Sequence, residues 1–220
     1  MATRFYFDPT NEPDVSPSFS AVHEDTTQAV RRKLVLDTPG NNASTNFTVS
    51  ETSAAGVSIL AVQFVSEPID SISAGLAVGK FAFRCIEDAA KSDAKIWLML
   101  RKCDGDGSNP ADIQTYADGT EFDDSVLTNR FYGPYNASDE IIAQGSRLIV
   151  EVSVYFTNSK TDSYSGTVNV TDNHATTDLG ENDTDTAAYN SWFETGDTFT
   201  EASGDPPAEV VKLGPMFAFA

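Results

Sequence analysis

One segment limits the possible folds more than any other: Gly145 to Thr157, which reads GSRLIVEVSVYFT. Its apolar positions on one side are Leu148, Val150, Val152, Val154 and Phe156. Because successive side chains of a β-strand point to opposite faces, this pattern predicts a central strand with one fully apolar face. We therefore expect Val152→Asp to prevent folding, since it would bury an unpaired charge. Glu151→Ala, on the opposite face, is expected to cost little.

The rest of the chain repeats this pattern in shorter pieces. Apolar or alternating segments recur about every dozen residues, and almost none has the period of a helix. They include 3–7, 47–51, 57–65, 79–86, 95–102, 126–132 and 163–171. Residues 79–86 and 95–102 are expected to pair as a hairpin, and residues 103–125 to form a loop. The sequence therefore predicts an all-β protein, an antiparallel β-sandwich that is jelly-roll-like.

The length of the chain favours a single domain. Its 220 residues fit one large sandwich, since single all-β domains often run to about 200–250 residues. We place the compact core at about 34–202. An extended N-terminal arm is expected at about 1–33, where three prolines exclude a helix. A C-terminal strand or arm is expected at about 203–220.

The charge of the chain excludes several kinds of partner. Fourteen Lys and Arg face 33 Asp and Glu, for a net charge of −19. Nucleic-acid binding requires a basic face, and an anionic membrane surface repels an acidic protein. The N-terminus lacks the apolar core of a secretory signal, so we expect a soluble protein made in the cytoplasm. High solubility explains the charge most simply; a saline habitat or a basic partner surface are the alternatives.

Motifs for catalysis or zinc binding are missing. His23 and His174, the two histidines, lack zinc-site spacing, and no G-x-S-x-G motif accompanies them as in a serine hydrolase. Acidic residues are so numerous that a glycosidase pair cannot be singled out. Cys85 and Cys103 are expected to be free, packed thiols. We therefore expect no enzyme and no cofactor, with glycan hydrolysis as a remote alternative.

A glycine-rich loop is a weak candidate for a calcium site. Asp104, Asp106 and Asn109 offer oxygen atoms at nearly alternating positions, as Ca²⁺ requires. The twelve-residue spacing with a final bidentate Glu is absent, and Asp-Gly is itself a turn signal. The simpler interpretation is a turn.

Aromatic residues could form a platform on which sugars stack. The candidates are Trp97, Trp192, Tyr132, Tyr135 and Tyr164. Such residues more often pack in a core or an interface, and we favour packing here.

The two chain ends hold the candidates for binding a protein partner. Arg31, Arg32 and Lys33 form the one basic cluster, which either contacts an acidic partner or is a solvated strand end. Aromatic anchors complete the set of partner-binding candidates. The full set is Phe5, Phe7, Phe19, Arg31, Arg32, Phe217 and Phe219.

Several short motifs, in order, resemble a family of tailed-phage virion proteins. The first two motifs are Arg4–Phe7 (RFYF) and Val15–Phe19 (VSPSF). Family members then carry a Gly-Asp-Arg-Leu-like turn before an apolar strand, followed by further short motifs. Here these read Gly145–Leu148 (with Ser146 in place of Asp), Asn158-Ser159, Ser163–Thr167, Thr177–Leu179 and Trp192–Glu194. The resemblance covers most of residues 3–33 and 80–200, and residues 209–219 have no counterpart in it.

The resemblance implies a non-enzymatic structural subunit of a phage particle, located in the virion and made in the host cytoplasm. We expect a capsid decoration or cement subunit whose partners are the major capsid protein or other virion subunits. Its arms would add backbone hydrogen bonds to a neighbour's sheet edge. A homo-oligomer is expected, a trimer being one form that capsid symmetry offers. The alternative is a tail-associated module that binds carbohydrate or a receptor.

Overall fold

The computed structural model describes residues 2–38, 40, 43–52, 56–70, 79–135, 142–157, 163–171, 177–196 and 198–200, without the side chains of Asp118, Pro134 and Tyr135. Every regular element within these residues is a β-strand, which confirms the predicted all-β class. No described helix is long and apolar enough to cross a membrane. The strands are β1 (Thr3–Phe7), β2 (Val30–Val35), β3 (Ser44–Glu51), β4 (Val57–Ser66), β5 (Gly79–Glu87), β6 (Ala94–Cys103), β7 (Ala111–Glu121), β8 (Thr128–Tyr135), β9 (Arg147–Phe156), β10 (Tyr164–Thr171) and β11 (Trp192–Thr195).

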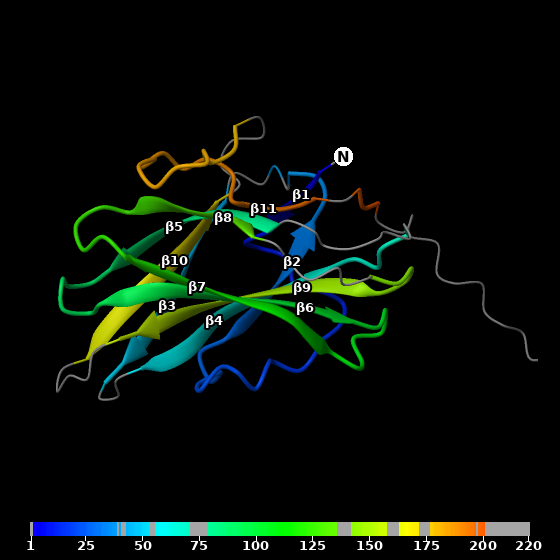
Figure 1. Cartoon of the computed structure of the whole chain (residues 1–220), viewed down its shortest axis with the longest axis horizontal. Helices are drawn as coiled ribbons and strands as arrows, with labels where there is room; N and C mark the ends of the chain where they lie inside the picture. The colour runs from blue at the N-terminus through cyan, green and yellow to red at the C-terminus, as the bar shows by residue number, and fades with distance from the viewer. Residues whose placement is uncertain are drawn as a thin grey trace, which may run out of the picture.

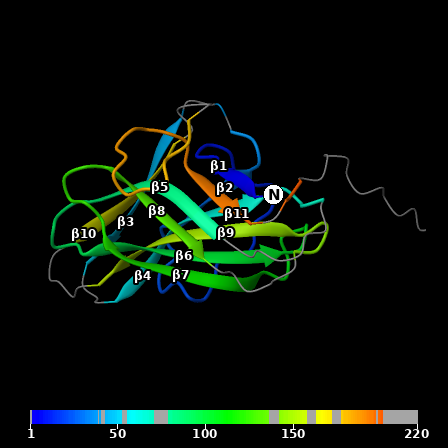
Figure 2. The same ribbon diagram turned by 45° about the horizontal axis from the view of Figure 1, so that its top comes forward.

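The strands join in one 11-stranded sheet that curls into two layers (Figures 1 and 2). Its order is β3-β10-β5-β11-β1-β2-β4-β9-β6-β7, and β8 pairs with β5. Neighbouring named strands run antiparallel except β2 and β4, which are parallel. One layer contains β4, β9, β6 and β7, and the other contains β3, β10, β5 and β8. β11, β1 and β2 connect the two layers.

β9 lies at the centre of the first layer, as its sequence predicts. It pairs with β4 on one side and β6 on the other. Val152 is fully buried, and its cross-strand neighbours are Val62 and Leu98. The apolar face of β9 belongs to the core between the layers, where Phe81 and Val168 come from the opposite side.

The two layers approach closely at Gly166 of β10. A Cβ atom on this residue would lie 2.6 Å from Cγ1 of Val154 on β9 and 3.3 Å from Cβ of Ala94. Carbon atoms do not come so close, so glycine is required where β10 crosses β9.

Two sequence-based assignments of secondary structure are wrong. Residues 79–86 and 95–102 do not form a hairpin: β5 pairs with β10, β11 and β8, whereas β6 pairs with β7 and β9. Each segment has an apolar face, and these faces meet the core from opposite layers. The expected loop at 103–125 contains β7, an edge strand whose partial exposure weakened its pattern.

The N-terminal arm expected at 1–33 is also corrected. β1 and β2 are strands of the sheet, and β1 pairs with both β2 and β11. Phe5 and Phe7 are 0% and 1% exposed. The arm therefore reduces to residues 8–29, which leave the sheet after β1 and return to it at β2. The C-terminal arm expected at 203–220 lies outside the described residues.

Candidate functional site

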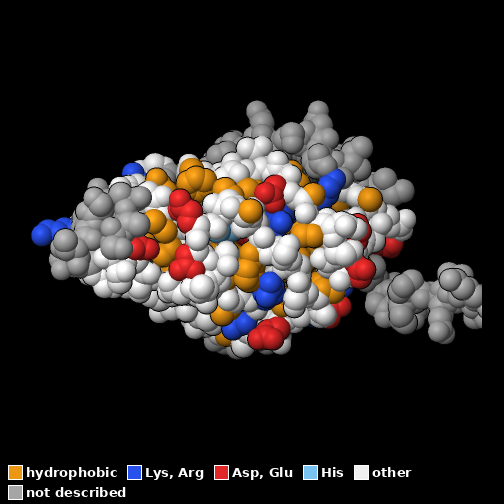
Figure 3. Space-filling view, turned by 90° about the horizontal axis from the view of Figure 1, so that it is seen from below, with side chains coloured by type: hydrophobic (Ala, Val, Ile, Leu, Met, Phe, Trp, Pro, Cys, Tyr) orange, Lys and Arg blue, Asp and Glu red, His pale blue; other side chains and the backbone are white. Residues whose placement is uncertain are grey.

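Residues 8–29, which we call the strap, cross the outer face of the layer formed by β4, β9 and β6. In Figure 1 the strap is the dark-blue chain that loops below the sheet. Figure 3 looks onto this face, where apolar and charged side chains are interspersed. Because both ends of the strap continue into strands of one sheet, it is a fixed connection rather than a free terminus.

Glu151 of β9 holds the strap to the sheet. Its side chain is fully buried, and each carboxylate oxygen accepts hydrogen bonds. Oε1 lies 2.8 Å from Nη1 of Arg101 and 2.8 Å from Nε2 of Gln63. Oε2 lies 2.8 Å from Nε2 of His23, and the backbone N–H of Ser20 reaches both oxygens at 3.2 and 3.3 Å. The assignment of this face of β9 to solvent is therefore wrong, because the strap covers it, and the expectation that Glu151→Ala would cost little loses its basis.

The charge of Glu151 is stabilised although it is buried. Burial by itself would raise the pKa of this carboxyl. The hydrogen bond to His23, the charge of Arg101 and the amide of Gln63 outweigh it and lower the pKa. We conclude that Glu151 is ionised in the folded protein.

Ser153, His23 and Glu151 form a chain of side chains like that of a catalytic triad. Nδ1 of His23 lies 2.8 Å from Oγ of Ser153, and Nε2 lies 2.8 Å from Glu151. A catalytic nucleophile must be accessible to its substrate. Ser153 is fully buried, and so are the side chains of His23 and Glu151. His23 also belongs to the strap, so lifting the strap would remove the base. These three residues therefore hold the strap in place.

Two buried arginines on the sheet also hold the strap. Arg101 Nη1 donates to the carbonyl of Ser18 at 2.6 Å, and its Nε bonds to Asp112 at 2.6 Å. Arg147 binds both carboxylate oxygens of Asp14 at 2.7 and 3.0 Å. These hydrogen bonds lower the pKa of Asp14.

Sequence reasoning missed this cluster, although the sequence contains a signal for it. Gln63, Arg101 and Glu151 each interrupt or end a run of apolar residues on a strand. A polar residue in such a place is expected to have buried hydrogen-bonding partners. The sequence alone does not say which segment supplies them.

A second ion-pair cluster lies on the outer face of β1 and β11. The guanidinium of Arg4 stacks 4.0 Å from the ring centre of Trp192. It bonds to Asp178 at 2.7 Å and to Glu194 at 2.8 Å. The hydroxyl of Tyr6 also donates to Asp178, at 3.2 Å. Three motifs of the resemblance, Arg4–Phe7, Thr177–Leu179 and Trp192–Glu194, thus meet in one cluster.

The Gly145–Leu148 motif also contacts the N-terminal part of the chain. Arg147 binds Asp14, the residue before Val15–Phe19. Val15 packs against Cys103 and Ile149. The motifs of the resemblance therefore join segments that are distant in sequence.

The predicted partner-binding residues divide into three groups. Phe5 and Phe7 are core residues, which corrects their assignment as contacts for a partner. Phe19 and the two arginines lie on the strap and on β2, and Arg31 stacks 4.1 Å above the ring centre of Phe19. Phe217 and Phe219 lie outside the described residues.

The calcium candidate forms a hydrogen-bonded turn. Asn109 Nδ2 donates to Oδ2 of Asp104 at 2.7 Å, and the N–H of Ser108 donates to Asp106 at 2.9 Å. Asn109 therefore directs its amide nitrogen, not its oxygen, at Asp104. Among the described residues, no three His, Cys, Asp or Glu side chains are grouped so that they could hold a metal ion.

Three of the five aromatic residues considered for a sugar-stacking platform pack in or against the interior, which is the interpretation that the sequence favours. Trp192 is fully buried, Tyr132 is in the core, and Tyr164 packs against it. Trp97 lies apart from these, half-buried on β6, with its ring centre 5.2 Å from that of Tyr155. The side chain of Tyr135 is outside the described part.

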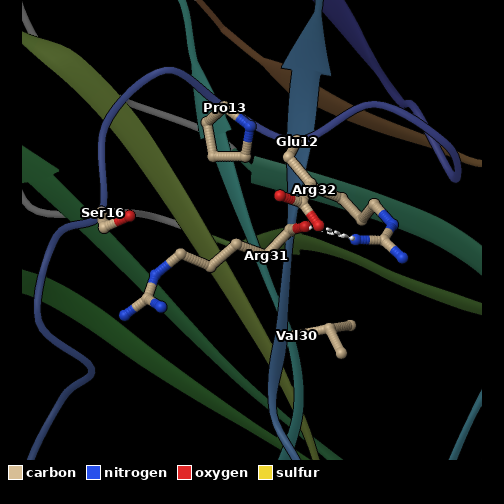
Figure 4. Close-up of a pocket in the computed structure, with 6 residues that line it drawn as sticks. All are labelled: Glu12, Pro13, Ser16, Val30, Arg31 and Arg32. Atoms are coloured by element: carbon tan, nitrogen blue, oxygen red, sulfur yellow. Dashed lines mark hydrogen bonds and ion pairs between the residues drawn. The ribbon is translucent and has the colours of Figure 1, made fainter.

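A pocket of about 250 Å³ lies between the strap and β2 (Figure 4). Its walls come from Glu12, Pro13 and Ser16 of the strap and from Val30, Arg31 and Arg32 of β2. Two predicted partner-binding residues, Arg31 and Arg32, thus line one cavity.

Comparison with known proteins bears on the fold alone. No family model matches the chain, and no curated protein matches it. An aminopeptidase from the marine sediment archaeon Thaumarchaeota archaeon is similar over 91% of this chain, with a TM-score of 0.53 and 10% identity. The chain spans 37% of that protein's length.

Two further solved structures resemble parts of the chain. A mitogen from Yersinia pseudotuberculosis matches 66% of this chain and 96% of its own, with 15% identity and a TM-score of 0.25. Eiger TNF from S. frugiperda matches 62% of this chain and 98% of its own, with 13% identity and a TM-score of 0.24. Similarity this low carries no argument about function.

Proposed function

We propose that this protein is a non-enzymatic structural subunit of a tailed-phage particle, a decoration or cement protein on the outer head surface. The proposal rests on the ordered motifs that resemble such proteins. One structural observation supports it: Arg4, Asp178, Glu194 and Trp192, which belong to three separate motifs, form one ion-pair and stacking cluster. Because these residues contact one another, we expect proteins that share the fold to carry all of them together.

The burial of the polar residues that hold the strap also favours a structural role. His23 and Glu151, which could serve acid–base chemistry elsewhere, are buried with Arg101 and hold the strap. Their hydrogen bonds fix the strap on the outer face of the sheet, which suits a protein that binds a shell through its surface.

Binding to the particle tests the proposal. Purified protein is mixed with expanded capsids that lack it, and the capsids are sedimented and imaged by electron microscopy. We expect cosedimentation and new density on the outer head surface. Protein that stays in the supernatant, or capsids without new density on their outer surface, would reject the decoration role.

A tail-associated carbohydrate-binding module is the second candidate. The observation in its favour is the half-buried pair of Trp97 and Tyr155 on the outer sheet face, because aromatic rings stack on sugars. A glycan array with host polysaccharides tests it, with Trp97→Ala as the variant. Micromolar binding that disappears in Trp97→Ala would replace the first proposal by this one.

A further inference from the structure

The pocket between the strap and β2 contains an arginine held in a fixed position. Nε of Arg31 donates to Oε1 of Gln63 at 2.9 Å, and Nη2 donates to the carbonyl of Pro17 at 3.0 Å. The guanidinium also stacks on Phe19. A charged group that is already immobilised loses little conformational entropy when it binds a ligand.

The contacts of Arg31 contain no direct ion pair. Its hydrogen-bond and stacking partners are an amide, a carbonyl and a ring, all of them neutral. The nearby carboxylate of Glu151 is already bonded to Arg101 and His23. Burial, only partly offset by the charge of Glu151, lowers the pKa of Arg31. Arg31 is thus a half-buried cation without a directly bonded counter-ion among the described residues.

The other arginines are placed differently. The hydrogen bonds of Arg84 and Arg130 also go to carbonyl and amide oxygens, but these two arginines are only 7% exposed. Arg32 leaves β2 on the side opposite Arg31 (Figure 4), with Glu12 3.7 Å away. Of the two arginines that line this pocket, Arg31 is therefore the one that can form an ion pair with a carboxylate from another molecule.

We propose that this pocket binds a carboxylate presented by a partner protein, an Asp or Glu side chain, with Arg31 as its counter-ion. The volume of about 250 Å³ suits a single side chain rather than a folded segment. Ser16 adds a hydroxyl to the pocket lining, and Pro13 and Val30 provide apolar walls for the methylene groups (Figure 4). Guanidinium and carboxylate groups match in charge and in planar geometry. A small free carboxylic acid shares this chemistry, so the experiment separates the two sources.

Titration followed by NMR tests the inference. The Nε–H signal of Arg31 is assigned in ¹⁵N-labelled protein, and acetyl-Gly-Glu-Gly-amide, its Gln counterpart and free glutarate are added separately. We expect the Glu peptide to shift this signal in a saturable way and the Gln peptide to leave it unchanged. A response to glutarate without one to the Glu peptide would overturn the proposal of a protein partner. Equal responses to the Glu and Gln peptides would overturn the role of charge.

Three variants separate binding from folding. Arg31→Gln should weaken Glu-peptide binding at least tenfold, but it also removes the bond to Pro17. Glu12→Gln keeps every contact of Arg31 and removes a negative charge from a side chain that is 80% exposed. It should strengthen binding about two- to fivefold, the size of an exposed ion-pair effect. Lys95→Gln, a charge change on β6, should have no effect.

Unchanged affinity in both Arg31→Gln and Glu12→Gln would refute the assignment of the pocket. The peptide experiment needs no capsid, so it and the capsid-binding experiment can fail independently. The inference depends on the geometry of the pocket and does not require that the partner be a phage protein.

Discussion

Glu151→Ala should be strongly destabilising, although its place in the strand sequence suggests a harmless surface change. The substitution removes the acceptor of four groups: Arg101, Gln63, His23 and the backbone N–H of Ser20. All four residues are buried, so water cannot freely take the place of the carboxylate.

The magnitude follows from the buried ion pair. Removing one partner of such a pair costs about 3–5 kcal/mol, because the other charge stays buried without compensation. Arg101 retains Asp112, which limits this loss, while Gln63 and Ser20 each lose an acceptor. We expect a loss of about 4 kcal/mol in the free energy of unfolding. For a chain of this size this corresponds to a fall in Tm of about 8–16 °C.

Urea and thermal unfolding monitored by circular dichroism measure the effect. Glu151→Gln, which keeps the shape and one acceptor oxygen, should fall between wild type and Glu151→Ala. Asp124→Ala removes the same charge from an exposed site and should change stability by less than about 0.5 kcal/mol. If Glu151→Ala lost less than about 1 kcal/mol, the buried cluster would not hold the strap as we argue.

Three further outcomes are expected. Val152→Asp places a charge among Val62 and Leu98 in the core and should give no soluble folded protein on expression. Gly166→Ala should lower Tm at a cost of about 1–3 kcal/mol. Val154→Ala, which removes the clashing methyl, should cost less in the Gly166→Ala background than alone, and equal costs in both backgrounds would argue against the close approach of the layers. Burial raises the pKa of Glu87 from 4.5 to about 7; the hydrogen bond from the Ala94 N–H opposes this rise, and the nearby carboxylates of Glu121 and Asp93 add to it. The folded state then binds more protons than the unfolded state, so stability should fall as pH rises from about 4.5 to 7. Melting curves across this range should lose that slope in Glu87→Gln, and an unchanged slope would contradict the assignment.

The strands could be predicted from sequence where one face is wholly apolar. Alternation in β9 fixed its inward residues, because a strand with a buried face shows a period of two. β7 was missed because it is an edge strand, where few positions are buried. The pairing of β5 with β10, β11 and β8 could not be predicted, since an apolar face does not reveal the layer to which its strand belongs.

The candidate site was predicted in part. Arg31 and Arg32 were singled out as a basic cluster, and both line the pocket. The clusters around Glu151 and Arg4 were missed as units because their members are distant in sequence. A charged residue within an apolar strand indicates that it has a buried partner, but the strand sequence does not show which residue that partner is.

The sequence by itself determined that this protein is built from strands and that Leu148, Val150, Val152 and Val154 face inward. It did so because side-chain direction along a strand depends on local geometry. Only the tertiary structure decided that the opposite face of β9 is also closed. The strap, whose own sequence shows no regular period, brings His23 and Ser20 onto Glu151. The local sequence pattern shows whether a residue is apolar. Whether that residue is buried depends on which distant segment covers it.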